Sequence, residues 1–316
     1  MNTVKVTCVE KGVLLNKAFQ FNFPVEYTEY EQLSQQQFYD QVHDQDVLII
    51  SDLKVDEKIL DHNPNLKLLA LCSTGYDHVD IELLKSRNIK ICNIRGYAGD
   101  AVAEHAFVLM MNLIKNFSSQ VKAVQDGTWS DSPVSFYLAA PIRELKNKNL
   151  VIVGKGEIGQ SLAEKAQAFG MKVIFSERKH ATTCREGYVP FSQAIQLADV
   201  LSLHCELNDE TRYMIDRTVL SQMKKDSILI NVGRGGLIHS EDVAEALTNQ
   251  QIAGFGADVL DQEPPAADHP LLKLKHPNVM ITAHIAWATD EAQERLFSIL
   301  ENNVNQNILC HDQNLV

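Results

Sequence analysis

No apolar run in this sequence approaches the roughly 20 residues that a membrane-spanning helix needs. The six cysteines are scattered without a CxxC pair, which argues against a zinc site or a disulfide framework and fits a reducing cytoplasm. The net charge of −12 argues against nucleic acid as a partner. The N-terminal residues show no secretory signal. We therefore expect a cytoplasmic protein that binds no membrane, no nucleic acid and no structural metal.

Apolar runs alternate with polar or amphipathic segments along the 316 residues, a length that suits two domains better than one. This alternation is typical of parallel sheets covered by helices and predicts two doubly wound α/β domains. The expected strands of the first series fall at 4–9, 47–50, 66–72 and 89–91. Those of the second series fall at 150–153, 172–175, 200–204, 227–232, 252–259 and 279–282.

Two helical segments bear on the division into domains. Residues 101–116 are apolar around most of the helix circumference, which predicts a buried helix. Residues 288–309 are amphipathic and long enough to return to the first domain. We therefore predict one domain from residues 1–98 plus 286–316 and another from 99–285, with the active site in the cleft between them.

A glycine-rich motif lies between an expected strand and an expected helix. In Gly154-Lys155-Gly156-Glu157-Ile158-Gly159 the first glycine permits a tight turn, the second lets the backbone approach a pyrophosphate, and the third lets helix and strand pack closely. The helix N-terminus offers N–H groups and partial positive charge to the phosphates. With a second strand following, the motif predicts a dinucleotide site.

Glu177 follows that second strand, 18 residues after Gly159. Its carboxylate is suited to accept hydrogen bonds from both ribose hydroxyls and to repel a 2′-phosphate, which predicts NAD rather than NADP as cofactor. Arg178 and Lys179 come directly after it and are suited to hold that phosphate if Glu177 swings aside. NADP is therefore the less favoured alternative.

Three later stretches carry a family resemblance: ILINVGRGGLIHSEDVAEAL (228–247), GFGADVLDQEPP (254–265) and ITAHIAWAT (281–289). Together with the glycine motif they resemble the D-isomer-specific 2-hydroxyacid dehydrogenases over nearly the whole chain. The HIAWAT ending and AAPIREL (139–145) are most similar to glycerate dehydrogenases, also called hydroxypyruvate reductases.

Arg234, Glu263 and His284 are the predicted catalytic residues. The rigid guanidinium fork of Arg234 is suited to a substrate carboxylate and its neighbouring keto oxygen. His284 would supply a proton to that oxygen, and Glu263 would orient the ring and stabilise the imidazolium. Taken singly, each has a structural alternative: a strand-end cap, an exposed loop acid or a hydrogen-bonded strand-end histidine. All three follow ends of expected parallel strands, where such folds bind ligands.

The resemblance implies further positions. The turn Ser73-Thr74-Gly75 corresponds to a loop that holds the substrate carboxylate, and Tyr97 to a side chain over the substrate. Trp287 would form part of the wall of the substrate pocket or would pack at a domain interface. The cofactor rim would include His204, Cys205, Val232 and Gly233, and Asp258 would lie near the nicotinamide. The resemblance also implies a homodimer, with the helix near 101–116 at its interface.

The expected reaction is the NADH-dependent reduction of hydroxypyruvate to D-glycerate. One alternative is a broad 2-keto acid reductase that acts on glyoxylate or pyruvate-like acids. A second is a binding protein that keeps the fold and senses NAD(H) without catalysis, because an intact Arg–Glu–His set favours an enzyme without proving one.

Overall fold

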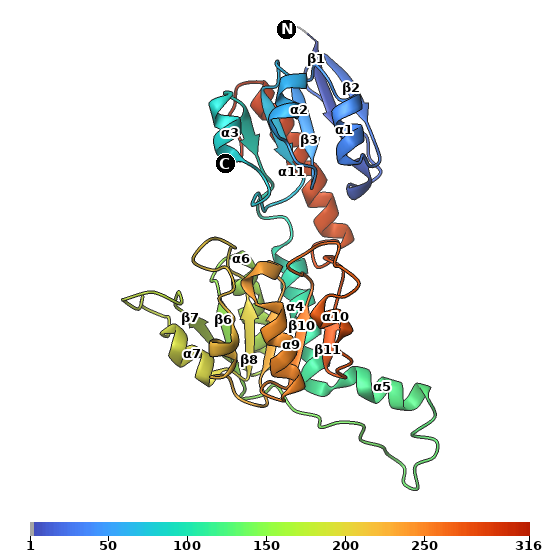
Figure 1. Ribbon diagram of the computed structural model, residues 1–316, viewed down its shortest axis with the longest axis vertical. Helices are drawn as coiled ribbons and strands as arrows, with labels where there is room; N and C mark the ends of the chain where they lie inside the picture. The colour runs from blue at the N-terminus through green and yellow to red at the C-terminus, as the bar shows by residue number, and fades with distance from the viewer. Residues whose placement is uncertain (1–2) are drawn as a thin grey trace. The chain divides into compact units, whose positions relative to one another are not determined.

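The computed structural model describes residues 3–316, which form two compact units. Unit 1 comprises residues 3–98 and 288–316, and unit 2 comprises residues 99–287. Each unit contains one sheet of parallel strands with helices packed around it (Figure 1). No helix within residues 3–316 is long and apolar enough to cross a membrane. The predicted fold class, two parallel-sheet α/β domains, is confirmed.

The sheet of unit 1 has the strand order β2-β1-β3-β4-β5. Strands β3 (Val47–Ile50) and β4 (Leu68–Leu71) are buried at every position, as expected for central strands covered on both faces. The other elements before residue 98 are β1 (Val4–Cys8), η1 (Lys11–Val13), β2 (Val25–Glu29), α1 (Gln35–Gln41), α2 (Glu57–His62), α3 (Ile81–Ser86) and β5 (Lys90–Cys92).

Strand β2 was not predicted from the sequence. Its residues, VEYTE, include two glutamates, and every side chain is exposed or half-buried. The strand forms an edge of the sheet and pairs with β1, from Val4↔Val25 to Cys8↔Glu29. An edge strand needs no continuous apolar run, so a search for such runs could not find it.

The C-terminal helix α11 (Asp290–Ile308) belongs to unit 1 and packs against β4. It begins at Thr289, whose side chain accepts a hydrogen bond from an amide of the first turn. Leu300 and Val304 are fully buried. The Asn303 side-chain amide donates to the Asn93 carbonyl at 2.9 Å, which ties the helix to the segment after β5.

The sheet of unit 2 has the order β11-β10-β9-β8-β6-β7. Its strands are β6 (Asn149–Val153), β7 (Lys172–Ser176), β8 (Val200–Leu203), β9 (Ile228–Asn231), β10 (Gly254–Ala257) and β11 (Val279–Ile281). Its helices are α4 (Gly99–Lys115), α5 (Phe117–Gln125), α6 (Glu157–Ala168), α7 (Phe191–Leu197), α8 (Arg217–Leu220), η2 (Gly235–Leu237), α9 (Ser240–Thr248) and α10 (Pro270–Lys273).

All neighbouring strands of unit 2 pair in parallel, so their carboxyl ends lie along one edge of the sheet. From β6 the chain moves to β7 on one side and then to β8 and on to β11 on the other. Ligands of doubly wound sheets bind outside the carboxyl ends, at the strand where this direction changes. In unit 2 that point lies between β6 and β8.

Helix α4 packs against α6, β9 and β10, and Ala103 and Leu113 on it are fully buried. This matches the predicted burial of the segment, although Val108 on the opposite face is exposed. After α4, helix α5 and the segment 126–145 extend away from the sheet of unit 2 (Figure 1). We call α5 and residues 126–145 the arm.

Candidate active site

The glycine-rich loop joins β6 to α6, as the sequence predicted. Gly154 has a φ of 102°, and a Cβ there would lie 2.6 Å from the carbonyl carbon and oxygen of His204. A Cβ on Gly159 would lie 2.1 Å from the Gly154 oxygen. A Cβ on Gly156 would meet nothing within 4 Å, which leaves the backbone open to approach by a bound group. The loop therefore fits a dinucleotide pyrophosphate.

Helix α6 begins at Glu157, behind Gly156 as its N-cap. Because glycine has no side chain to accept a hydrogen bond from the first turn, the amides at the start of α6 have no side-chain cap and are available to a bound phosphate. The end of the neighbouring strand β8 carries the half-buried His204, whose Nε2 lies 2.8 Å from Ser202 Oγ and whose Nδ1 is buried. Burial lowers the pKa of His204 to about 4, so the ring beside the loop is neutral at neutral pH.

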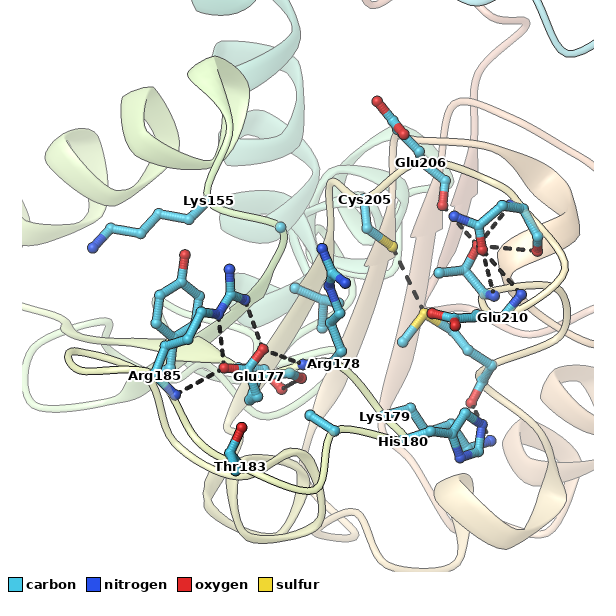
Figure 2. Close-up of a pocket in the computed structure, with 18 of the residues that line it drawn as sticks. Lys155, Glu177, Arg178, Lys179, His180, Thr183, Arg185, Cys205, Glu206 and Glu210 are labelled. Atoms are coloured by element: carbon cyan, nitrogen blue, oxygen red, sulfur yellow. Dashed lines mark hydrogen bonds and ion pairs between the residues drawn. The ribbon is translucent and has the colours of Figure 1, made fainter.

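A pocket of about 650 Å³ opens at the ends of β6 and β7 (Figure 2). It brings together four of the predicted cofactor residues: Gly154, Glu177, Arg178 and Cys205. The others lie nearby or elsewhere on the same edge of the sheet. A Cβ on Gly233 would lie 3.4 Å from the Leu203 oxygen, at the end of β8, and Val232 is buried before it.

Glu177 lies on the floor of this pocket and is paired with Arg185. Its Oε1 accepts hydrogen bonds from the Arg178 amide at 2.9 Å and from Arg185 Nη2 at 2.6 Å. Its Oε2 accepts from the amide and Nε of Arg185 at 3.0 and 2.8 Å. The hydrogen bonds from Arg185, followed by that from the Arg178 amide, lower the pKa of Glu177 to about 2. The carboxylate is therefore ionised but already engaged.

His284 and Glu263 form the predicted pair. His284 Nδ1 lies 2.7 Å from Glu263 Oε2, and Oε1 of the same carboxylate accepts the Leu260 amide at 2.7 Å. The hydrogen bond to Glu263 raises the pKa of His284, against the opposing effect of burial. Burial raises the pKa of Glu263, but the hydrogen bonds from His284 and Leu260 outweigh it and hold that pKa below its usual value. An ionised carboxylate thus fixes Nδ1 as the donor and leaves Nε2 to exchange a proton.

Arg234 follows β9, and its guanidinium donates to the Gly233 carbonyl at 3.1 Å. Its charge acts on both members of the pair: after the larger effects just given, it lowers the pKa of His284 and of Glu263. The three catalytic residues predicted from the sequence therefore follow neighbouring strands β9, β10 and β11 and interact electrostatically. This arrangement can hold an anion and deliver a proton beside it.

Asp258 is buried at the end of β10 and shapes the backbone around His284. Its Oδ1 accepts from Thr282 Oγ1 at 2.6 Å and from the Ile285 amide at 2.9 Å, and Oδ2 accepts from the Ala286 amide at 2.7 Å. The His284 amide donates to the Asp258 carbonyl at 2.8 Å, and His284 has a φ of 56°, in the left-handed region. The resemblance placed Asp258 near the nicotinamide. The structure directs its carboxylate to the backbone that carries His284.

The predicted substrate-binding residues are divided between the units. In unit 1, the turn after β4 is fixed by hydrogen bonds from Ser73 Oγ to the Gly75 carbonyl and from Thr74 Oγ1 to the Ile94 carbonyl. Tyr97 is buried in the same unit. In unit 2, the Trp287 indole N–H donates to the His284 carbonyl at 2.9 Å. Their roles toward a substrate stay predictions.

Arg185 lines the pocket and pairs with Glu177, and it was not predicted from the sequence. It comes from the loop after β7, eight residues beyond Glu177, and no strand or helix periodicity marks it. The available signal was chemical: a polar loop with an arginine follows a carboxylate at the strand end of a dinucleotide motif. Only the returning path of the loop shows that the two side chains meet.

A parallel sheet with a glycine loop at its switch point, and an acid-supported imidazole near a guanidinium on the same edge, defines a dinucleotide-dependent oxidoreductase. Residues 107–286 match the family described as D-isomer specific 2-hydroxyacid dehydrogenase, NAD binding domain. The chain belongs to this family, and it is an oxidoreductase that acts on 2-hydroxyacids.

Individual relatives agree over most of the chain. A glycerate dehydrogenase of Methylorubrum extorquens is 34% identical over 315 residues, which cover 99% of each chain. A glyoxylate reductase of Thermococcus litoralis is 37% identical over 263 residues, 82% of this chain and 78% of the relative. Among solved structures, the TT0316 protein of Thermus thermophilus superposes with a TM-score of 0.84 at 28% identity, covering 99% of this chain and 100% of that one.

Proposed function

We propose that the protein is a glycerate dehydrogenase that reduces hydroxypyruvate to D-glycerate. The His284–Glu263 hydrogen bond of 2.7 Å, with the Arg234 charge acting on both groups, is the observation that carries the proposal. The full-length similarity to the Methylorubrum extorquens glycerate dehydrogenase and the HIAWAT and AAPIREL sequences support the choice of substrate. In this proposal unit 2 binds the dinucleotide and carries Arg234, Glu263 and His284, which act on the substrate.

Arg234, His284 and Glu263 each carry a separate part of the proposed reduction. Arg234 binds the substrate carboxylate and polarises the adjacent keto oxygen. A bound NADH supplies the hydride that the keto carbon receives. His284 transfers the proton from Nε2 to the keto oxygen as negative charge develops there, and Glu263 stabilises the imidazolium before the transfer. One keto acid, one NADH and one proton thus give one D-hydroxy acid and one NAD⁺.

Comparison of 2-keto acids with NADH, followed by absorbance at 340 nm, tests the substrate. Hydroxypyruvate is expected to exceed both glyoxylate and pyruvate in kcat/KM by about 10-fold or more, because contacts to one extra group discriminate by about 10–200-fold. A higher kcat/KM for glyoxylate would instead make the enzyme a glyoxylate reductase, as the Thermococcus litoralis relative is named.

We also propose that the protein works in the cytoplasm as a homodimer joined through the arm. The six cysteines are free thiols, as a reducing compartment maintains them. The arm exposes large apolar side chains that a second copy would cover, namely Phe117, Val121, Val124, Trp129, Val134, Phe136, Tyr137, Leu138 and Ile142. Helix α4, the predicted contributor to the interface, directs the chain into this arm.

Sedimentation at micromolar concentration checks the assembly. The wild-type chain is expected to sediment as a dimer, and the double variant F136S/L138S as a folded monomer, because two exposed apolar side chains of the arm become polar. The matched control is Leu272→Ser, which makes the same change at an exposed leucine on α10, outside the arm. A wild-type monomer, or a control that dissociates equally, would reject the arm as the interface.

A further inference from the structure

The loop between β7 and α7 carries Arg185, whose guanidinium pairs with Glu177. Glu177 is at the position where a carboxylate normally selects NAD. Glu177 offers two oxygens with about four acceptor positions in all. Four donors are directed at them: the amides of Arg178 and Arg185, and Nε and Nη2 of Arg185. The ribose hydroxyls of an adenosine would therefore meet no vacant acceptor on Glu177 while this pair is formed.

Arg185 is also held in this position by a cation–π contact with Tyr188. Its guanidinium carbon lies 4.0 Å from the centroid of the Tyr188 ring, and the Glu177 side chain beneath it is 4% exposed. The guanidinium itself is about half exposed and lines the pocket. The charge of Glu177 is thus compensated from within the chain, and the repulsion that the sequence predicted against a 2′-phosphate is cancelled.

The same pocket wall carries additional groups suited to a phosphate. Arg178 extends into the pocket from the end of β7 (Figure 2). Within residues 3–316, no hydrogen bond or ion pair engages its guanidinium. The Thr182 and Thr183 side chains also line this wall. Lys179 is less available, because its amine donates to the Met214 carbonyl and lies 3.2 Å from an Asp216 oxygen.

Carboxylates also reach the pocket. Glu206 and Glu210 line it from the loop after β8, on the side away from Arg185 (Figure 2). Glu177 is the carboxylate on the wall formed after β7, and Arg185 neutralises it. That wall, with Arg178 and Arg185 present, therefore has a net positive charge.

We propose that the pocket accepts the 2′-phosphate of NADP(H), with Arg178 and Arg185 binding it and the Glu177–Arg185 ion pair removing the discrimination that favours NAD(H). The inference rests on the proposed function only in that the pocket holds the adenosine end of the dinucleotide. Arginine is suited to this role because its planar fork binds phosphate oxygens in pairs. The enzyme then uses either dinucleotide as hydride donor, rather than NADH alone.

Binding measurements without any keto acid test this proposal. Titration calorimetry on the wild-type protein is expected to give dissociation constants for NADPH and NADH within about tenfold of each other, because hydrogen bonds from Arg178 and Arg185 to the 2′-phosphate offset the lost ribose contacts. The fragment 2′,5′-ADP is expected to bind more tightly than 5′-AMP. NADPH binding more than tenfold weaker than NADH would overturn the proposal.

Variants assign the effect to residues. Arg185→Ala frees the Glu177 oxygens for the ribose hydroxyls and restores the uncompensated carboxylate charge, so it is expected to weaken NADPH binding about 100-fold and to leave NADH binding unchanged or tighter. Arg178→Ala is expected to weaken NADPH about tenfold with NADH unchanged, and it remains informative if Arg185→Ala does not fold, because Arg178 is exposed. Lys172→Ala serves as control, because it removes one positive charge at an exposed position of β7 outside the pocket. Equal losses for both dinucleotides in the arginine variants would contradict the assignment.

The outcome is separable from that of the proposed function. If NADPH binds as expected but hydroxypyruvate is not reduced with either dinucleotide, the substrate proposal fails and the cofactor inference stands. If hydroxypyruvate is reduced with NADH and NADPH neither binds nor supports turnover, the cofactor inference fails and the substrate proposal stands.

Discussion

Replacing His284 with alanine is expected to lower kcat for keto-acid reduction by about 10²–10⁴-fold, the usual contribution of a positioned general acid. The variant keeps Arg234 and the glycine loop, so the dissociation constants of the dinucleotide are expected to change little. Stopped-flow turnover and calorimetric binding on the same preparation separate the two quantities. Near-native turnover in this variant would remove His284 from the mechanism.

Glu263→Gln provides the matched comparison, because it preserves the size of the side chain and removes its charge. In the wild-type enzyme, Glu263 raises the pKa of His284, so the imidazolium needed for reduction persists to higher pH and is lost as pH rises through that pKa. In the variant the alkaline limb of the reduction profile is expected to move to lower pH. A profile that does not move would assign Glu263 a structural role alone.

Replacing Arg234 with lysine is expected to lower kcat/KM by about 10²–10³-fold, comparable to the loss of one donor to a developing oxyanion. Lysine keeps the positive charge but cannot hold two oxygens in the geometry of the guanidinium fork. Because the carboxylate is bound in both the ground state and the transition state, whereas the keto oxygen gains charge only during reaction, KM is expected to rise and kcat to fall together.

Arg217→Lys is the control for this substitution. Arg217 lies on α8, is largely exposed and pairs with Asp242 and Glu245, so the same chemical change there is expected to leave both kinetic constants unaltered. If Arg234→Lys behaves like this control, recognition of the substrate carboxylate must be assigned to other residues.

Features that depend on local chemistry were predictable from the sequence. The glycines at 154 and 159 are required by close backbone contacts, and buried strands such as β8 and β9 consist of residues that only a covered sheet accommodates. Arg234 and Glu263 could be located because they follow the buried strands β9 and β10, and His284 because it follows the half-buried edge strand β11. In these cases the sequence pattern and its physical cause lie within a few residues of each other.

Features that depend on the path of the chain were not predictable. Strand β2 exists because β1 offers it an edge, and its own polar sequence gives no indication of this. The Glu177–Arg185 pair depends on how an irregular loop returns to the strand it left. Likewise, the sequence could place Asp258 at a strand end but could not show that its carboxylate would bind two amides beyond β11.

The left-handed backbone conformation at His284 affects the stability of the folded protein. A non-glycine residue held at positive φ carries a conformational penalty, which persists because Asp258 anchors the amides on either side of the turn. Natural selection for heat resistance alone would favour glycine at that position. If His284 is the proton donor, as proposed, this penalty accompanies the fixed orientation of its imidazole.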